Sequence, residues 1–440
     1  MSVENNAPNN ASAIALYLGE SYASLGVFNL SEKKSPQLSF EKSVFLPQIS
    51  FKNLLNQTKV ALPEAQIKKV FIVTRYLDRL KSFRLGGSVA QVVLEGFENS
   101  YAATNTKALS LAASTLVISV TEEKIDEEFL TAELARIKKI NPDANKIVLQ
   151  LPEDKISAKK RELVHAFFTK AEFKIFVCSQ PSDLGQVRRS LLNAGSEGTK
   201  EEILSEIKEA FGEDTEILFW TGTEFTTKFE NYELFASASD FLASCISDEK
   251  AQFGAYLDHE SFRMITTVPK RPWASPWGLI PLEHKDLAEL PPHPFSEIKL
   301  DHLSMLSIAK KPMQYEPGPV MAGRGMKPLV IDAFQEDLAD NNYMQSLFPN
   351  MNSELQKKKI QNHFSVLEKG QATNLLSTTK KEMKSYIQAG LLTEIKQMSK
   401  NKPVVLMGPL QHLIPDDKNV VANRTKNFFW PTEIMKKALT

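Results

Sequence analysis

Short apolar runs alternate with longer amphipathic stretches along most of the chain. The apolar runs are about five residues long, which is typical of strands, whereas the amphipathic stretches cover ten or more residues with a helical period. This alternation predicts an α/β protein with mixed sheets flanked by helices. We expect strands at 14–18, 23–29, 70–74, 115–120, 146–151, 174–178, 216–220, 253–257, 329–331 and 404–407, and helices at 126–139, 157–170, 183–193, 200–211, 352–368 and 378–398.

Two interruptions of this pattern divide the chain. The segment AGSEGT at 194–199 is rich in small residues and predicts an interdomain linker. Residues 269–294 contain seven prolines, and because proline breaks helices and cannot donate in a sheet interior, we expect a long surface flap there. The predicted organisation is therefore a disordered polar tail at 1–12, an α/β domain at 13–195, and a second α/β domain at 200–440 that carries the flap at 269–294.

Composition excludes several classes of protein. The 440 residues include 53 Lys and Arg against 53 Asp and Glu, so a general binder of nucleic acid or of anionic membranes is not expected. Two cysteines cannot form a disulfide framework or, alone, a cysteine-rich zinc site. The sequence has no run of 18 apolar residues, and residues 1–12 lack the basic and apolar regions of a signal peptide. These features predict a cytoplasmic protein without a membrane span.

Glycine is scarce, and the usual motifs of phosphate and metal chemistry are missing from the sequence. The 18 glycines make up about 4% of the chain, against an average near 7%. The first predicted strand is not followed by GxGxxG, and GxxxxGK[ST], HExxH, CxxC and GxSxG do not occur. Proteins that bind phosphate through the backbone normally use glycines at the point of close approach.

One segment nevertheless resembles a known family. The sequence PGPVMAGRGMKPLVIDA at 317–333 is similar to the PGPxxxGRGGxPTVTDA segment of the hydantoinase A/5-oxoprolinase family. The turn at 220–223 and the segment at 234–239 are similar in order and spacing to that family's QSNGG and SGPA turns, and 405–410 resembles its GGAGPL turn. The resemblance runs in order from about residue 13 to 334. It implies a two-lobed actin/Hsp70-like (ribonuclease H-like) fold of the kind found in sugar kinases.

The chain departs from this family where phosphate would be held. In the family's first hairpin, an aspartate, two glycines and a threonine surround magnesium and phosphate. Tyr256 stands where the second hairpin would carry an aspartate. Tyrosine cannot replace a carboxylate as a magnesium ligand, and added acids repel phosphate, so we predict that neither ATP nor Mg²⁺ is bound. In this chain, Tyr17, Gly19, Glu20, Ser21 and Ser24 occupy the positions at which the family's first hairpin carries its magnesium and phosphate residues.

Candidate site residues follow from the resemblance, although it identifies no catalytic base. Asp332, Arg324 and Asp258 are the candidates for a catalytic role. Arg324 and Asp332 either line a ligand cleft or form a buried ion pair that fixes their loop. Asp258, His259 and Glu260 are consecutive in a hairpin and cannot all converge on one metal, so we expect an exposed turn and no metal site. The ligand-cleft candidates are Gly19, Ser21, Ser24, Thr221, Gly222, Ser237, Ser239, Gly318, Gly323, Gly325 and Gly408.

Other notable side chains have structural interpretations. Cys178 and Cys245 lie in apolar surroundings and are expected to pack in the core. Arg75 and Arg79, with Asp78 between them, could reach a cleft, but a surface salt bridge is the default expectation. Trp273 and Trp277, in the proline-rich flap, could instead form a surface for a partner or ligand.

Two functional hypotheses remain open. The first is a hydantoinase/oxoprolinase-like hydrolase that opens a cyclic amide, with a diverged or lost ATP site. The second is a catalytically inactive ligand-sensing or scaffold protein on the same fold. The resemblance allows a companion hydantoinase B-like subunit, a homodimer or a small-molecule ligand as partners.

Overall fold

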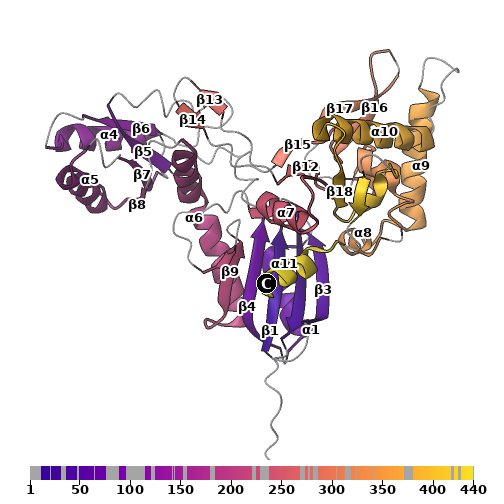
Figure 1. The fold of residues 1–440 in the computed structure, drawn as a ribbon, viewed down its shortest axis with the longest axis horizontal. Helices are drawn as coiled ribbons and strands as arrows, with labels where there is room; N and C mark the ends of the chain where they lie inside the picture. The colour runs from indigo at the N-terminus through magenta and orange to yellow at the C-terminus, as the bar shows by residue number, and fades with distance from the viewer. Residues whose placement is uncertain are drawn as a thin grey trace, which may run out of the picture.

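The computed structural model describes most of the chain between residues 11 and 439. The described part excludes residues 20, 31–35, 47–48, 64, 76–88, 96–113, 120–123, 141, 143, 152–155, 179–183, 221–223, 228–236, 268–272, 276–277, 281–285, 304, 313–318, 324, 340, 371–379, 418–420 and 425–427. Figure 1 shows a central sheet with one arm on each side.

The central sheet, sheet A, has six strands. Antiparallel pairing joins β1 to β2 and β2 to β3, whereas β1, β4 and β9 are parallel neighbours. Every side chain of β1 from Ser12 to Leu18 is buried, because both faces of the sheet are covered. The strand order is β10 (Phe225–Thr226), β9 (Glu216–Trp220), β4 (Gln66–Thr74), β1 (Ala11–Leu18), β2 (Tyr22–Asn29) and β3 (Gln37–Phe45).

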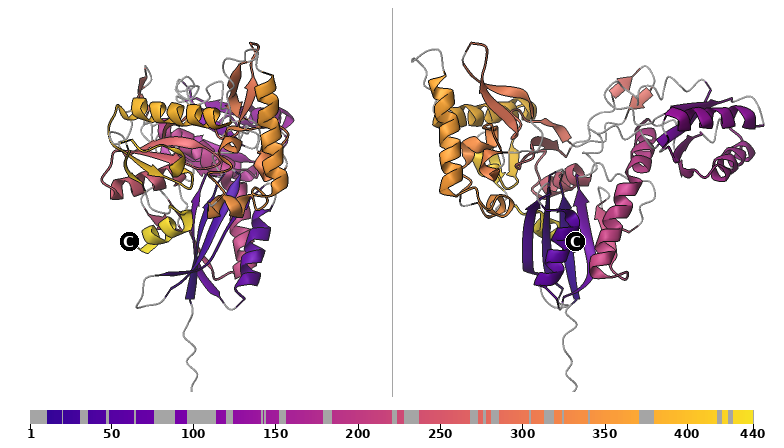
Figure 2. Two further views of the ribbon diagram at one scale, coloured as in Figure 1. Left: turned by 90° about the vertical axis from the view of Figure 1, so that its right-hand side faces the viewer. Right: turned by 180° about the vertical axis from the view of Figure 1, so that it is seen from behind.

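Helices cover both faces of sheet A. Helices α1 (Phe51–Ala61) and α6 (Leu184–Phe211) lie on one face, and α11 (Trp430–Leu439) lies on the other, beside α7 (Ser237–Asp248) (Figure 2). Alternate residues of β1 therefore belong to different cores: Ile14 packs with the α1 and α6 side, and Tyr17 packs with the α7 and α11 side.

A second sheet, sheet B, is inserted between β4 and β9 of sheet A. Its four strands are all parallel. Helices α4 (Glu127–Ile140) and α5 (Ala158–Lys170) supply apolar side chains to the core on one face. The strand order is β6 (Ser114–Ile118), β5 (Val89–Leu94), β7 (Lys146–Gln150) and β8 (Lys174–Val177).

The third sheet, sheet C, repeats the topology of sheet A. Its first three strands are antiparallel neighbours, and β11, β18 and β19 are parallel, as β1, β4 and β9 are in sheet A. Two sheets of this topology in one chain confirm the predicted two-lobed α/β architecture. The strand order is β15 (Asp286–Glu289), β12 (Phe262–Thr266), β11 (Phe253–Leu257), β18 (Val404–Met407) and β19 (Val421–Arg424).

The remaining elements surround sheet C, except for a short hairpin of β13 (Trp273–Ser275) and β14 (Gly278–Ile280) within the predicted flap. A second hairpin is formed by β16 (Ser296–Leu300) and β17 (Leu306–Pro312). The helices of this region are η3 (Val320–Ala322), η4 (Val330–Phe334), α8 (Asn342–Leu347), α9 (Glu354–Lys369), α10 (Lys380–Ser399) and η5 (Gln411–Leu413).

Two local expectations are wrong. Residues 194–199 are not a linker but lie inside α6, and strands β9 and β10 beyond them complete sheet A, so a division at 195–200 crosses one helix and one sheet. Residues 330–331 begin the 3₁₀ helix η4 instead of a strand. Cys178 and Cys245 are buried free thiols, as expected. Within the described ranges, no helix is both long and apolar enough to cross a membrane.

Candidate functional site

The turns of two topologically equivalent hairpins meet between the lobes. One turn joins β1 to β2 and contains Ser21; the other joins β11 to β12 and contains His259 and Glu260. The backbone N–H of Ser21 donates a hydrogen bond to the Glu260 carboxylate. The Ser21 hydroxyl lies 3.3 Å from Nε2 of His259. We call these two segments the turn pair: residues 18–22, of which Glu20 lies outside the described residues, and residues 257–262.

Asp258 organises the second of these turns. Its Oδ1 accepts hydrogen bonds from the N–H of Glu260 at 2.9 Å and of Ser261 at 2.7 Å. The N–H of Asp258 also donates to the carbonyl of Ser261 at 3.1 Å. An aspartate that bonds the backbone two and three residues further on stabilises a tight turn without glycine.

The second turn is buried, contrary to the expectation of an exposed one. Asp258 and His259 have no exposed surface, and Glu260 is 1% exposed. The first turn covers Glu260, and Tyr343 of α8 covers His259. The sequence pattern missed this because the covering residues come from distant parts of the chain.

His259 is a neutral side chain in an aromatic environment. Its Nδ1 lies 2.7 Å from the hydroxyl of Tyr343. The rings of Tyr22, Phe295 and Phe348 approach it edge-on, with centroids 4.6 to 6.3 Å away. Burial lowers the pKa of His259 to about 3, so the ring is uncharged at neutral pH.

Arg75 brings a positive charge to the turn pair. It directly follows β4, and its guanidinium donates to the hydroxyl of Ser261 at 2.8 Å. Burial raises the pKa of Asp258, and the positive charge of Arg75 is the largest influence that opposes this rise. Arg75 is 2% exposed, so the expected surface salt bridge is wrong.

Aromatic side chains fill the space beside the turn pair. Tyr17 stacks on Trp430 of α11, with ring centroids 3.9 Å apart and planes 5° apart. Trp430 Nε1 donates to the hydroxyl of Tyr256 at 2.6 Å. The Tyr256 and Tyr22 hydroxyls are 3.2 Å apart, and Tyr22 donates to Asp258 at 3.3 Å. The hydroxyls of Tyr22 and Tyr256 and the carboxylate of Asp258 thus form one buried hydrogen-bond network, in which the carboxylate is an acceptor.

The glycines of this region allow the protein to pack on itself. A Cβ at Gly19 would lie 2.8 Å from Oε2 of Glu260 and 2.9 Å from the Tyr22 ring. A Cβ at Gly408, whose φ is +98°, would lie 2.3 Å from the carbonyl oxygen of Leu257. Gly19, Ser21, Asp258 and Gly408 are therefore the predicted site residues that the structure brings to the turn pair.

Asp332 has a different set of contacts. Its carboxylate accepts hydrogen bonds from the N–H groups of Val320, Met321 and Leu329 at 2.9 to 3.1 Å. Burial raises its pKa to about 6, although these three donors oppose the rise. Gly323 ends η3 with φ +84°, and the predicted Gly-Arg-Gly loop is thus anchored to η4 through Asp332.

The other predicted cleft residues are dispersed or lie outside the described residues. The Ser24 hydroxyl bonds the hydroxyl of Ser43 across β2 and β3. Ser239 is buried in α7, and Gly325 is partly buried. Thr221, Gly222, Gly318 and Arg324, and the side chain of Ser237, lie outside the described residues.

Three residues of the site were not singled out from the sequence: Tyr22, Tyr343 and Trp430. An aromatic residue in a strand or a helix is usually core, so no signal distinguished them. Across the described ranges, no group of three or more His, Cys, Asp or Glu side chains could hold a metal ion.

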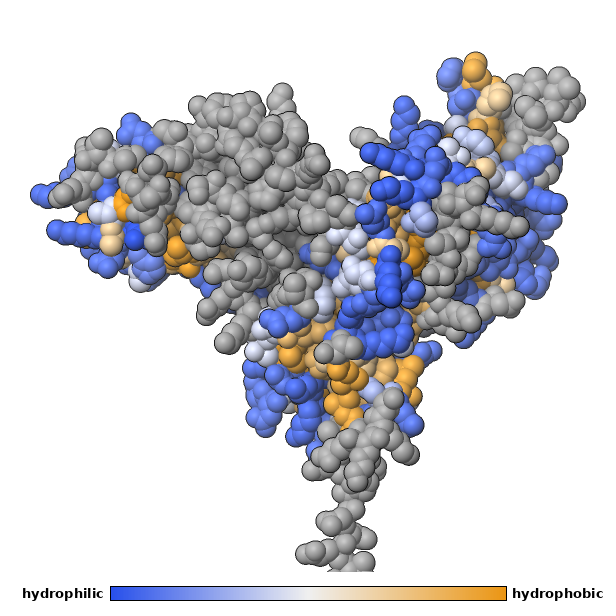
Figure 3. Space-filling view, in the orientation of Figure 1, coloured by the Kyte–Doolittle hydropathy of each residue, from blue (hydrophilic) through white to orange (hydrophobic). Residues whose placement is uncertain are grey.

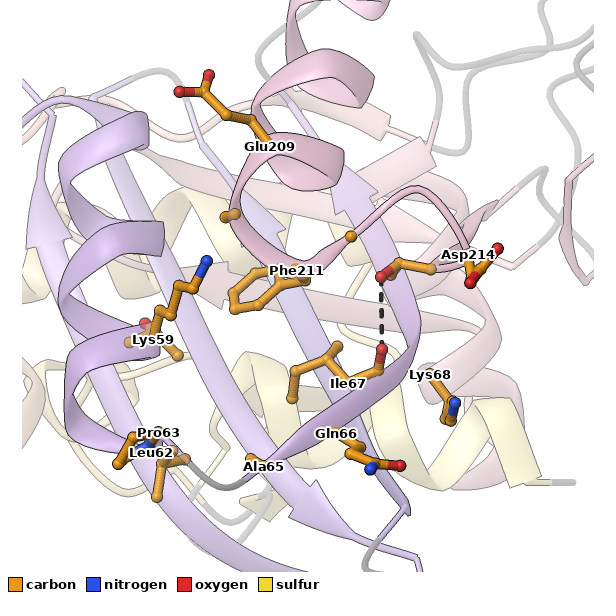
Figure 4. Close-up of a pocket in the computed structure, with 14 residues that line it drawn as sticks. Lys59, Leu62, Pro63, Ala65, Gln66, Ile67, Lys68, Glu209, Phe211 and Asp214 are labelled. Atoms are coloured by element: carbon orange, nitrogen blue, oxygen red, sulfur yellow. Dashed lines mark hydrogen bonds between the residues drawn. The ribbon is translucent and has the colours of Figure 1, made fainter.

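A separate cavity of about 440 Å³ lies at the opposite end of sheet A. It is bordered by the ends of α1 and α6, and Figure 4 shows the Phe211 ring pointing into the space between α1 and β4. Thr215 bonds the carbonyl of Ile67 at 3.4 Å in its wall. Its lining includes Lys59 and Glu209 but none of the predicted site residues.

Comparison with solved structures supports the fold described above, whereas comparison of sequences finds no match. No family model and no curated protein sequence matches the chain. The structure is similar to the crystal structure of an ATP-dependent caprolactamase from Pseudomonas jessenii, with a TM-score of 0.56 and 12% identity. The alignment covers 90% of this chain and 65% of that one. The likeness shows the fold.

A second solved structure is less similar. A ROK family transcriptional regulator, a homologue of the E. coli MLC protein, aligns over 98% of this chain and 79% of that one, with 10% identity. Its TM-score of 0.29 is too low to support any inference. The fold assignment therefore rests on the caprolactamase and on the repeated topology of sheets A and C.

Proposed function

We propose that this chain is a non-catalytic scaffold or ligand-sensing protein on the actin/Hsp70-like fold, with its interlobe site filled by its own side chains. The observation that carries the proposal is the direct contact of the turn pair. Ser21 bonds Glu260 across the lobes, and a Cβ at Gly19 would already clash with Glu260. In the family that the sequence resembles, a nucleotide's phosphates would lie between these turns.

Electrostatics supports the same proposal. Asp258 and Glu260 are buried at the turn pair, and their carboxylates would face the charges of a triphosphate in a medium of low dielectric. Tyr17 stands where the resembled family has its magnesium aspartate, and it is stacked on Trp430 instead of facing a cavity. Binding Mg·ATP there would require this packing to open.

Thermal unfolding with and without Mg·ATP tests the proposal. A nucleotide at 100 times its Kd would stabilise the protein by about 2.7 kcal/mol. For 440 residues this corresponds to a rise in Tm of about 3 °C. We expect no rise at millimolar Mg·ATP relative to a control with magnesium tripolyphosphate of equal ionic strength. A nucleotide-specific rise of that size would overturn the proposal.

A second candidate function is a hydantoinase/oxoprolinase-like hydrolase that opens a cyclic amide. Its support is the fold shared with an enzyme named as an ATP-dependent caprolactamase, since caprolactam is a cyclic amide. A resonance-stabilised amide is a poor electrophile, so this function needs an activation step or a companion hydantoinase B-like subunit. The test is incubation with caprolactam, hydantoin or 5-oxoproline, with and without Mg·ATP, and detection of the ring-opened acid by mass spectrometry. Product formed by the wild type and not by Asp258→Asn would favour the hydrolase over the scaffold.

A further inference from the structure

A groove of about 910 Å³ separates strand β17 from helix α10. One wall consists of the consecutive residues 305–310, and another is the face of α10 between Glu382 and Glu394. Pro291, Pro292, His293 and Ser296 complete the lining. Side chains of a strand alternate between its two faces, so six consecutive residues can border one groove only along the edge of the strand. The groove is therefore lined by backbone as well as by side chains.

Along the edge of β17 that borders the groove, alternate backbone N–H and C=O groups have no strand partner among the described residues. Ile308 lies opposite Ile298 of β16, and the N–H of Ile298 donates away from β17, to the carbonyl of Pro328, at 2.9 Å. This pair is thus a non-hydrogen-bonded one, so the N–H and C=O of Ile308 point away from β16. The N–H of Asp301 donates to the carbonyl of Met305 at 2.9 Å, so these two residues form a hydrogen-bonded pair. Hydrogen-bonded and non-hydrogen-bonded pairs alternate along the hairpin, and this bond agrees with the assignment of the Ile298 and Ile308 pair.

By this alternation, the N–H and C=O groups of Leu306 also point away from β16. Within the described residues, β16 is the only strand that pairs with β17, and residues 306–310 of β17 line the groove. An exposed edge of this kind is a template for another strand.

Helix α10 leaves room for such a strand. A Cβ at Gly390 would meet nothing within 4 Å, and Ala389 beside it is small. Glycine in a helix interior costs roughly 1 kcal/mol relative to alanine, so its presence here keeps space at the expense of helix stability. Met383 and Ile387 are buried beneath the groove, and Tyr386 stands at its rim with 69% of its surface exposed.

The dimensions fit one short strand. The helix face from 382 to 394 is about 18 Å long at 1.5 Å per residue. About five residues of extended chain cover this length at roughly 3.3 Å per residue. Since α10 closes the groove opposite β17, a single segment fits there, whereas the two-stranded edge of a second copy does not.

We infer that the groove between β17 and α10 binds an extended segment of a partner protein, which adds a strand to β17. The segment would place alternate apolar side chains toward Met383 and Ile387. An acidic residue would lie beside Lys310 of β17, and basic residues would lie beside Glu382 and Glu394 of α10. Exposed Leu303 and Met305 at the hairpin tip would extend the apolar contact (Figure 3). The inference does not depend on the turn pair or on whether the chain is an enzyme.

A random heptapeptide library displayed on phage, selected against the full chain, tests the inference. A Cβ at position 390 meets no atom within 4 Å, and Gly390→Phe replaces a poor helix former while placing a ring in the groove, so this variant should fold. Ser385→Phe adds the same ring at an exposed position of α10 outside the groove and is the matched control. We expect selected peptides to bind the wild type and Ser385→Phe equally, and Gly390→Phe at least about tenfold more weakly.

Methylation of peptide nitrogens then separates strand addition from simple apolar contact. In an added strand, every second peptide N–H faces β17. Synthetic peptides methylated at those nitrogens should lose binding, and peptides methylated at the intervening nitrogens should keep it. The inference is overturned if no selected peptide depends on Gly390, or if both methylation patterns act alike. It is also overturned if Gly390→Phe abolishes self-association of the chain in sedimentation, since a second copy would then be the occupant.

Discussion

Acid should destabilise this protein through the uncharged ring of His259. The pKa of His259 is lowered to about 3 in the folded state by burial, against about 6.5 for an unfolded chain. As pH falls below 6.5, the unfolded state takes up a proton at this residue and the folded state does not. The contribution of His259 to stability is therefore complete above pH 6.5 and is lost progressively as pH falls toward 3.

The size of the effect follows from the two pKa values. Each pH unit between them changes the free energy of unfolding by about 1.36 kcal/mol, so His259 alone lowers it by about 2.7 kcal/mol at pH 4.5. Asp332 acts in the opposite direction. Its pKa is raised to about 6 by burial, so the folded state takes up a proton first and gains about 2 kcal/mol between pH 6 and 4.5. The free energy of unfolding of the wild type therefore changes with pH through opposing contributions. A variant is needed to measure the contribution of His259 alone.

His259→Gln provides this variant, and urea denaturation at pH 7.5 and 4.5 is the assay. We expect the variant to be less stable than the wild type at pH 7.5, because contacts with Ser21 and Tyr343 are altered. On acidification, however, it should lose about 2.7 kcal/mol less than the wild type. His302→Gln, at an exposed position, is the control and should follow the wild type. Equal losses for the wild type and His259→Gln would refute the assignment of a buried, uncharged ring.

Three further substitutions test the packing. Trp430→Ala removes the ring stacked on Tyr17 and should lower the free energy of unfolding by about 3–5 kcal/mol, measured by urea denaturation; a loss below 1 kcal/mol would contradict the stack. Asp332→Asn replaces a carboxylate that accepts three backbone hydrogen bonds by an amide with one acceptor oxygen, and should cost about 2–3 kcal/mol in the same assay. Gly408→Ala should be far more damaging in thermal unfolding than Gly212→Ala, because both glycines have positive φ but only the Cβ at Gly408 meets another atom within 4 Å; similar Tm losses would show that φ alone matters.

Local periodicity predicted nine of the 19 strands that the structure describes, together with helices α4, α5, α9, α10 and both halves of α6. The strands at 216–220, 253–257 and 404–407 have the predicted bounds, since short apolar runs in this chain are buried on both faces. Periodicity failed at 194–199 because Leu191 before the segment and Ile203 after it pack in the same core, and this packing outweighs the weak helix propensity of two glycines. The apolar sequence at 329–331 predicts a strand. However, the Asp332 carboxylate accepts a hydrogen bond from the N–H of Leu329, and the 3₁₀ helix η4 begins at Val330.

The candidate site could be predicted only in part. The resemblance singled out residues of both turns and Gly408, and the structure brings these residues close together. Burial of the second turn was not predictable, since Ser21 and Glu260 are 239 positions apart in the sequence and an acidic turn is ordinarily solvated. Burial of Arg75 was not predictable either. Its buried charge is stabilised by partners at the turn pair and not by its neighbours in sequence.

The stack of Tyr17 on Trp430 also sets the order in which this protein can be completed during synthesis. Strand β1 and helix α11 are separated by about 400 residues of sequence, so this face of sheet A can be completed only after all of the intervening chain has been made. Before that point, Tyr17 lacks the ring on which it stacks in the folded protein. A chain cut before Trp430 would therefore leave this face of sheet A without the helix that covers it.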